Sequence, residues 1–378
     1  NEIYLSNEGL RGSGDFEYLT SKTKSEEIYF FPDSTALFTQ DFLLKEVESG
    51  IEFPQVDNKE TFGLYQPYNE RYKIHKLQKP FNFYNNLASF DGNVVLRPTG
   101  LTGEGIMSLD NLEMESVFFT YNANWFAADT ADLSVFTQQK GIAFKSNNLK
   151  TNIDLKYRTG DFFSNGKGSY VELPTNQYIC YIDKLHWDMD KELLTLGDLD
   201  EKSKGSKFVS IHPNQDSLSF IAKTSTYNLK DNVINVQGVN EILVADAAIY
   251  PSEGFTIEKN AVISTITSAR ILANTGTKYH EFTNAIVNID GLGSKYTASG
   301  DYTYKDVNGE DQYIFFNEIV TKEDSTIAIA SVGNNEPFKI GSKFIFKGNV
   351  NLRASKRVLT FDGFFKIDNK CDLISEEW

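Results

Sequence analysis

The sequence predicts an all-β protein, organised as an elongated, solenoid-like array of stacked repeat units with almost no helix. Three observations support this prediction: apolar and polar residues alternate along many segments, short motifs recur at fixed spacings, and aromatic residues are abundant. The 29 phenylalanines and 19 tyrosines favour strands, because aromatic side chains fit a pleated, half-buried surface. Strict alternation is the pattern of a strand with one buried face.

The longest repeat is a ten-residue motif near the N-terminus. The segment from Leu5 to Gly14 returns 91 positions later as the segment from Leu96 to Gly105. Both follow the pattern L-x-x-x-G-L-x-G-x-G. Internal repetition at a fixed spacing indicates repeated structural units, so we expect stacked β-units to build the chain.

Alternation is clearest in the C-terminal third of the chain. The segments 296–304, 344–354 and 359–367 each place apolar or small residues on one face and polar residues on the other. We expect one of these faces to point inward; in the second segment it comprises Phe344, Phe346, Gly348, Val350, Leu352 and Ala354. No helical stripe is longer than about ten residues, which is short for a helix.

Two finer repeats support the same architecture. The pattern from Trp187 to Leu196 matches the pattern from Tyr227 to Val236, with a polar triplet in each that we expect to be a hairpin turn (190–192 and 230–232). The motif F-x-G-N-V-x-L-R occurs at 90–97 and again at 346–353. Its glycine lies in the middle of a predicted strand, where it indicates a bulge or a close approach of neighbouring backbone.

At 378 residues the chain is longer than a single ordinary hydrophobic core supports. We expect one continuous repeat array over residues 1–378. Its repeat blocks are roughly 1–50, 91–196 and 208–378. The proline-containing segment 51–90 is expected to be an irregular insert, and the charged segment 197–207 an exposed loop. Because the sequence opens with Asn1 inside a strand-like segment, we expect a mature product or a fragment of a longer protein.

The net charge of −15 argues against a nucleic-acid partner, which would require a basic face, and against an anionic membrane surface. No apolar run approaches the length of a transmembrane helix. Of the two cysteines, Cys180 lies in an apolar run and is expected to be buried in a strand. The sequence leaves undecided whether Cys180 and Cys371 form a disulfide, because a single pair of cysteines does not indicate a disulfide framework.

Catalytic and metal-binding motifs are missing from the sequence. The four histidines lie far apart, and acidic groups such as 188–192 and 198–201 are typical of solvated turns. The candidates weighed are His75, His186, His212, His280, Asp188, Asp190, Glu192, Asp198, Asp200 and Glu201. A glycosidase or lyase would need such carboxylates paired across a cleft, which spacing alone cannot establish. We therefore predict no catalytic residue, no metal, no cofactor and no enzymatic activity.

Two further groups have competing interpretations. The segment from Asp306 to Asp311 could bind calcium, but Asn308-Gly309 between aromatic strands favours a type I′ hairpin turn. Five aromatic residues could form a platform for sugars, although a structural role in the core is the stronger interpretation: Tyr65, Tyr68, Tyr72, Trp125 and Trp187.

The segment from Tyr227 to Val239, followed by Ala245-Asp246-Ala247-Ala248, resembles the OstA-like repeat. That family includes the periplasmic bridge proteins of lipopolysaccharide transport. The Gly-Asn-Val triplets at 92–94 and 348–350 fit another part of the repeat, and Ala128-Asp129-Thr130-Ala131 echoes the last part. More closely, the chain resembles large uncharacterised β-rich envelope proteins of Gram-negative bacteria. The resemblance implies an elongated β-jellyroll, or "taco", in the periplasm, at the outer membrane or on the cell surface.

The hypothesis that follows is a non-enzymatic cell-envelope β-repeat protein. It would shield or conduct lipid or lipopolysaccharide in an open groove, or act as a scaffold with a closed, packed interior. Its partners would be lipid, lipopolysaccharide or adjoining β-repeats of the same or another protein. A lipid groove would be lined by inward apolar residues such as Phe344, Phe346, Val350 and Leu352. Two alternatives stay open, namely a carbohydrate-binding or polysaccharide-degrading β-protein and a surface adhesin or assembly module.

Overall fold

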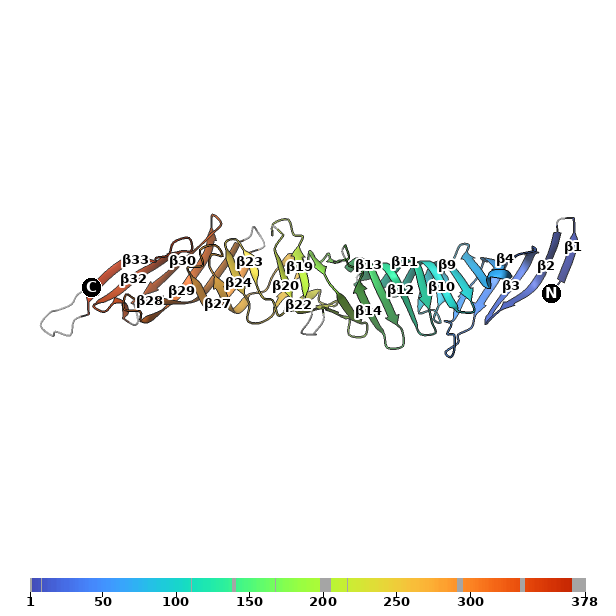
Figure 1. Cartoon of the computed structure of the whole chain (residues 1–378), viewed down its shortest axis with the longest axis horizontal. Coiled ribbons are helices and arrows are strands. Elements are labelled where there is room, and N and C mark those ends of the chain that lie inside the picture. Colours follow the sequence, from blue (N-terminus) through green and yellow to red (C-terminus); the bar gives the residue numbers. More distant parts are fainter. Residues whose placement is uncertain are drawn as a thin grey trace. The chain divides into compact units, whose positions relative to one another are not determined.

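The structure is a computed structural model of the chain (Figure 1). It describes residues 2–7, 9–109, 111–137, 141–166, 168–197, 205–215, 217–290, 295–333 and 337–368. In these residues the chain forms 33 strands, and helix is limited to two 3₁₀ turns of three residues each. The predicted all-β class is therefore confirmed.

The chain divides into two compact units. Unit 1 comprises Asn1–Pro174, Ile182–Leu196 and Asn228–Lys230, and unit 2 comprises the remainder. The strands of unit 1 are β1 (Glu2–Ser6), β2 (Gly9–Tyr18), β3 (Ser21–Phe30), β4 (Thr35–Leu44), β5 (Val56–Asn58), β6 (Thr61–Gln66), β7 (Arg71–Lys76), β8 (Phe81–Phe83), β9 (Ala88–Arg97), β10 (Gly100–Leu109), β11 (Leu112–Tyr121), β12 (Trp125–Phe136), β13 (Ile142–Asp154), β14 (Thr159–Ser164), β15 (Val171–Leu173), β17 (Lys184–Asp188) and β18 (Leu193–Leu196), with a 3₁₀ turn at Pro67–Asn69.

Unit 2 contains the second 3₁₀ turn, Lys259–Ala261, and nearly all of the remaining strand residues. Its strands are β16 (Tyr178–Tyr181), β19 (Ser206–Ser210), β20 (Ser219–Ala222), β21 (Thr224–Asn228), β22 (Val233–Gln237), β23 (Ile242–Val244), β24 (Ala247–Tyr250), β25 (Phe255–Ile257), β26 (Ile266–Leu272), β27 (Glu281–Asp290), β28 (Lys295–Lys305), β29 (Asp311–Lys322), β30 (Ser325–Val332), β31 (Phe338–Gly341), β32 (Phe344–Arg353) and β33 (Thr360–Ile367).

Unit 1 is an antiparallel meander whose long strands bend and contribute to two facing layers. β4 pairs with β6 through residues 35–39 and with β5 through residues 42–44. β9 likewise pairs with β7 through one half and with β8 through the other. Aromatic rings meet between the layers, because Phe42 contacts Tyr72 and Phe83 contacts Tyr121, with ring centroids 6.4 Å and 4.8 Å apart. The layers thus enclose one aromatic core.

The 91-residue repeat extends well beyond its ten-residue motif. Shifted by 91, the bounds of β2 and β3 become those of β10 and β11. The same bends recur, with register shifts at Gly12/Gly14 in one pair and at Gly103/Gly105 in the other. β1 repeats the second half of β9, because it meets β2 in the register with which β9 meets β10. The repeated sequence therefore specifies a repeated set of bent strands.

The glycines of the F-x-G-N-V-x-L-R motif mark a close approach of two backbones, as predicted. Gly92 lies directly opposite Gly105, and Gly348 lies directly opposite Gly363. A Cβ atom on either motif glycine would collide with a carbonyl oxygen of the facing strand. The ring of the motif phenylalanine, Phe90 or Phe346, packs beside its glycine. Both units therefore contain the same close contact between two glycines, although the positive φ is on Gly105 in one pair and on Gly348 in the other.

Unit 2 continues with shorter strands and then returns to long ones. β16, β19, β20, β23, β24 and β26 pair in succession, and β22 pairs with β25. From β26 to β30 the chain is a simple meander, followed by β32 and β33. Stacked rings such as Phe208 and Phe220, 5.3 Å apart, fill the interior. The hairpin expected at 187–196 is present in unit 1, with Asp188 opposite Leu193.

Two sequence predictions need correction. The segment 51–90 is no irregular insert, because it forms β5 to β8 and the start of β9. These strands have only three to six residues and prolines lie between them, so alternation is hard to recognise. Within 197–207, Ser206 and Lys207 begin β19, and Ser206 is buried; residues 198–204 lie outside the described part. Whether the two units form one continuous array stays a prediction.

Candidate functional site

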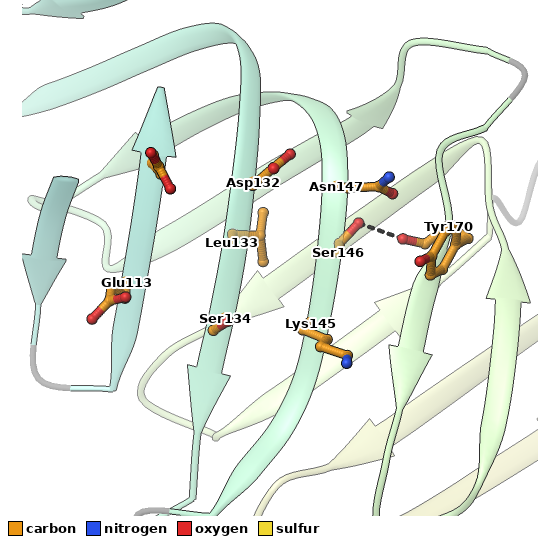
Figure 2. A pocket seen from close by; sticks show the side chains of 9 residues that line it. Glu113, Asp132, Leu133, Ser134, Lys145, Ser146, Asn147 and Tyr170 are labelled. Carbon is orange, nitrogen blue, oxygen red and sulfur yellow. Dashed lines mark hydrogen bonds between the residues drawn. The ribbon is translucent and has the colours of Figure 1, made fainter. Parts of the chain in front are cut away.

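A first candidate site is an acidic hollow on the surface of unit 1 (Figure 2). Glu115 on β11 lies directly opposite Asp132 on β12, with Glu113 beside them and Lys145 on β13. Like charges on facing residues destabilise a strand pair, so this arrangement is not explained by stability.

The chemistry available in this hollow is nevertheless limited. The Ser146 hydroxyl donates to the Tyr170 carbonyl oxygen at 2.6 Å, and Lys145 is paired with Glu172 at 3.0 Å. A serine nucleophile needs a neighbouring base instead of a carbonyl acceptor. Among the residues that the structure describes, no three His, Cys, Asp or Glu side chains are grouped so as to hold a metal ion.

A second candidate is a hollow of opposite charge, which we call the basic hollow. It lies over β7, β9, β10 and β11 of unit 1. Arg71, Lys73 and His75 alternate along β7, and Arg97 stands on β9. Because side chains two apart in a strand share a face, the three basic residues of β7 point to the same side of the sheet.

The rest of the basic hollow is a short polar network and an apolar wall. His75 Nδ1 lies 2.8 Å from Asn93 Oδ1, and the Asn93 amide donates to Glu104 Oε1 at 3.2 Å. These three residues face one another across β7, β9 and β10. Val117 and Phe118, both exposed, form the wall where β11 bulges.

The third candidate is a pair of uncovered sheet edges, which we call the terminal edges. Among the described strands β1 pairs only with β2, and β33 only with β32. Both edge strands expose large apolar side chains: Leu5 on β1 is 79% exposed and Phe365 on β33 is 64% exposed. Unpaired backbone N–H and C=O groups together with exposed apolar residues form a template for a further strand.

The four histidines do not gather into one site. His75 belongs to the basic hollow, and His186 pairs with Asp161 at 2.9 Å between Nδ1 and Oδ1. His212 accepts a backbone hydrogen bond through Nδ1 from residue 214. His280 is buried, with Nδ1 3.0 Å from the Tyr302 hydroxyl and Nε2 2.6 Å from the carbonyl oxygen of residue 356. Burial lowers the pKa of His280, although the bond to that carbonyl opposes this effect.

The acidic group 188–192 forms ion pairs around a turn. Asp188 accepts from Lys191 at 2.6 Å, and this hydrogen bond is the main cause that lowers the pKa of the Asp188 carboxyl. Asp190 accepts from Arg158 at 2.5 Å, while Glu192 has a positive φ in the turn itself. Both ion pairs are exposed, as expected for solvated turns. The other acidic group, Asp198, Asp200 and Glu201, lies outside the described residues.

The turn at 306–310 joins β28 to β29, but it is not the expected type I′ turn. The Asp306 carboxylate accepts the backbone N–H groups of Asn308 and Glu310, and of the loop residues only Gly309 has a positive φ. A type I′ turn requires positive φ at two residues. Burial raises the pKa of Asp306, yet these hydrogen bonds outweigh it and leave the pKa lowered. The aspartate therefore closes a five-residue loop.

Most of the aromatic residues considered for sugar binding are unavailable. Tyr72 and Trp187 are buried, and Tyr65 packs on Tyr18 with ring centroids 4.8 Å apart. Of the others, Tyr68 is exposed in a 3₁₀ turn and Trp125 stands at the start of β12. The five residues therefore do not share one exposed face, and the favoured structural role holds for the buried Tyr72 and Trp187.

Cys180 is buried, and burial raises the pKa of its thiol, which disfavours the reactive thiolate. It is free of any disulfide to a described residue, and Cys371 lies outside the described part.

The inward apolar face of β32 is only partly as expected. Phe346, Val350 and Leu352 are buried, but Phe344 is 53% exposed, so its predicted inward position is wrong. Phe344 lies at the start of the strand between the likewise exposed Ile367 of β33 and Gly341 of β31, which has no side chain to cover it. Phe346 packs against the ring of residue 361, with centroids 5.3 Å apart. Packed side chains surround the buried positions.

The aspartate of the OstA-like segment has a structural role. The Asp246 carboxylate accepts the backbone N–H of Thr326 at 3.0 Å and its hydroxyl at 2.6 Å. It also accepts from the Asn274 amide at 3.1 Å. These bonds join the turn before β24 to the start of β30. Asp129 in the echo of this segment is exposed and pairs instead with Lys150 at 3.6 Å.

Comparisons with known proteins give no relative: no family model, no curated protein and no solved structure matches the chain. Among the described residues, no helix is long and apolar enough to cross a membrane. The basic hollow was missed in the sequence because its β7 residues lie in a segment taken for an insert, and the others meet them only through strand pairing. The alternation of Arg71, Lys73 and His75 is the signal that could have indicated it.

Proposed function

We propose that this chain is a non-enzymatic β-repeat scaffold that assembles by adding strands at its terminal edges. As the OstA-like resemblance suggests, it would do so in the envelope of a Gram-negative bacterium. The observation that carries the proposal is the equivalence of the terminal strand pairs to an internal pair. β32–β33 shares the glycine pair and register of β9–β10, and β1–β2 repeats its second half.

In the internal pair, both outer edges are covered by neighbouring strands. β10 is covered by β11, and β9 is covered by β7 and β8. The corresponding edges of β33 and β1 pair with no described strand. Met107 of β10 is completely buried, whereas Phe365, the residue at the same distance from the glycine pair on β33, is mostly exposed. Covering Phe365 and its neighbours would supply the hydrophobic driving force for assembly.

We expect the added strand to come from a second copy of the chain, with β1 of one copy antiparallel to β33 of another. The joined pair then retains one open edge of each kind, β33 on one copy and β1 on the other, so the contact is heterologous and produces growing rows unless a ring closes. Exposed Ile3 and Leu5 on β1 would meet exposed Phe365 and Ile367 on β33. The packed interior of each unit favours a scaffold over a lipid conduit.

Sedimentation velocity over a wide concentration range tests the proposal with three variants. Leu5→Lys and Phe365→Lys place a charge at a terminal edge, and we expect each to raise the dissociation constant by at least about tenfold, or about 1.4 kcal/mol. Ile329→Lys is the matched control, because Ile329 is 36% exposed on β30 and is itself paired on both sides, with Glu318 of β29 and Asn351 of β32. A wild-type chain that stays monomeric at every concentration, or an equal effect of all three variants, would contradict the proposal.

A further inference from the structure

The basic hollow is unusual in a chain of net charge −15. Three of its side chains, those of Arg71, Lys73 and Arg97, are cations, and all three are partly buried. None of the ion pairs in the described part of the chain includes any of them. Arg71 donates to the neutral Gln66 side chain, through Nε at 2.6 Å. The three cations outnumber the one carboxylate of the hollow, Glu104, and none forms an ion pair with it, so the excess positive charge attracts an anion.

The polar network of His75, Asn93 and Glu104 restricts which chemical groups that anion can carry. Asn93 bonds to both of its neighbours, which fixes the positions of His75 and Glu104 beside the cations. Glu104 can only accept hydrogen bonds at neutral pH, and it repels an anion that has no donors. A ligand that fits must therefore carry negative charge and also donate hydrogen bonds. Sugars with carboxylate groups do both, through the carboxylate and the ring hydroxyls.

The wall of the hollow fits the same ligand. Phe118 is 52% exposed beside Glu104 at the bulge of β11, and Val95 lies on β9 between Asn93 and Arg97. Exposed rings provide the apolar surface on which the C–H face of a sugar packs. The hollow is open and its volume is about 260 Å³, below the size of most enclosed ligand sites. It suits a short part of a longer polymer.

We propose that the basic hollow binds a segment of an acidic polysaccharide. Arg97 and Lys73 bind sugar carboxylates, Glu104 and Asn93 bind ring hydroxyls, and Phe118 packs on a sugar face. Arg71 adds positive charge at the end of the hollow. None of these residues lies on β1 or β33, so binding is independent of assembly at the terminal edges.

Isothermal titration with a galacturonate oligomer tests this proposal on the full chain. We expect the wild type to bind the oligomer, with an affinity that falls as salt is added, and to bind its methyl-esterified form far more weakly. Lys73→Glu and Arg97→Glu should each weaken binding by about tenfold or more, because each loses a charge-assisted bond. Lys156→Glu makes the same charge change in an exposed turn of unit 1 outside the hollow, and should leave the affinity unchanged.

Two further measurements make the test decisive. Glu104→Ala should weaken binding of the galacturonate oligomer but strengthen binding of polyglutamate, an anion without hydroxyl groups. Thermal unfolding of every variant establishes that it is folded. The proposal is overturned if the wild type does not bind the galacturonate oligomer, if polyglutamate binds equally well, or if Lys156→Glu loses as much affinity as Lys73→Glu.

Discussion

The internal strand pair β9–β10 and the terminal pairs β1–β2 and β32–β33 are built from the same local sequence but have different surroundings. The register across each pair is equivalent, and Gly92 and Gly348 both face a glycine. Both strands of the internal pair bury most of their apolar residues, whereas the outer strands of the terminal pairs, β1 and β33, expose most of theirs. The local sequence therefore specifies the bend and the pairing, while burial depends on which strands lie alongside.

This comparison separates two contributions to stability. The close backbone approach at the glycine pair is internal to each strand pair and should matter wherever it occurs. The hydrophobic contribution requires a neighbouring strand and should be incomplete at the terminal edges. The substitutions below test contributions to stability that arise within the strand pairs and at their bends.

The largest expected effect is at the internal glycine pair. In Gly92→Ala the new Cβ would collide with the Glu104 carbonyl oxygen, and β9 is held by strands on both sides. We expect the free energy of unfolding in urea to fall by about 3 kcal/mol. Gly363→Ala at the terminal pair, where the new Cβ would collide with the Lys347 carbonyl oxygen, should cost less, because β33 has no outer neighbour among the described strands and can move away.

Gly50→Ala is the control for backbone strain alone. Gly50 has a φ of +79°, and no atom lies within 4 Å of the position that a Cβ would take, so the substitution should cost about 1 kcal/mol. Gly92 has no positive φ, so its larger cost must come from the collision. If Gly92→Ala costs no more than Gly50→Ala, the close backbone approach does not penalise a Cβ atom as this account requires.

A smaller effect is expected at two serines that are 91 positions apart. The Ser25 hydroxyl donates to the carbonyl oxygen of residue 38 at 2.7 Å, and the Ser116 hydroxyl donates to that of residue 130 at 2.6 Å. Both are buried where a strand bends. Ser25→Ala and Ser116→Ala should each cost about 1–2 kcal/mol in urea unfolding. A clear difference between them would mean that the two bends are not equivalent.

The smallest effect is a pH dependence of the region that leads into β33. Buried His280 holds the carbonyl oxygen of Lys356, between β32 and β33. Because its pKa is lowered in the folded chain, the unfolded chain takes up the proton first. The stability contributed by neutral His280 is complete above pH of about 6.5 and is lost as the pH falls through the folded pKa.

Urea unfolding at several pH values checks this, with His280→Gln as the variant. The variant should be less stable than the wild type at neutral pH and should lose less stability on acidification. Parallel pH profiles for the two proteins would show that His280 does not contribute to the dependence.

Several features of the fold could be predicted because the sequence repeats them. The segments around Gly12 and Gly103 both form bent strands, and the motif glycines face other glycines as expected. The prediction failed where strands are too short for a pattern to develop, as in β5 and β8. It also failed at Phe344, because alternation gives a side chain its face but not the neighbour that would cover it.

The candidate sites were harder to predict than the fold. Lys73 and Arg97 are 24 positions apart and share a hollow only because β7 pairs with β9. The terminal edges become visible only once the strand pairing is known. Both depend on long-range pairing, which a local pattern does not contain.

Hydrogen–deuterium exchange tests the central claim most directly, since it reports on each strand separately. The amides of residues 2–6 and 360–367 would be followed at low and high protein concentration, with residues 93–97 and 100–109 as the internal equivalents. The account predicts that the terminal strands exchange quickly in dilute solution and approach the protection of β9 and β10 as the concentration rises. Fast exchange of both terminal strands at every concentration would contradict assembly by strand addition.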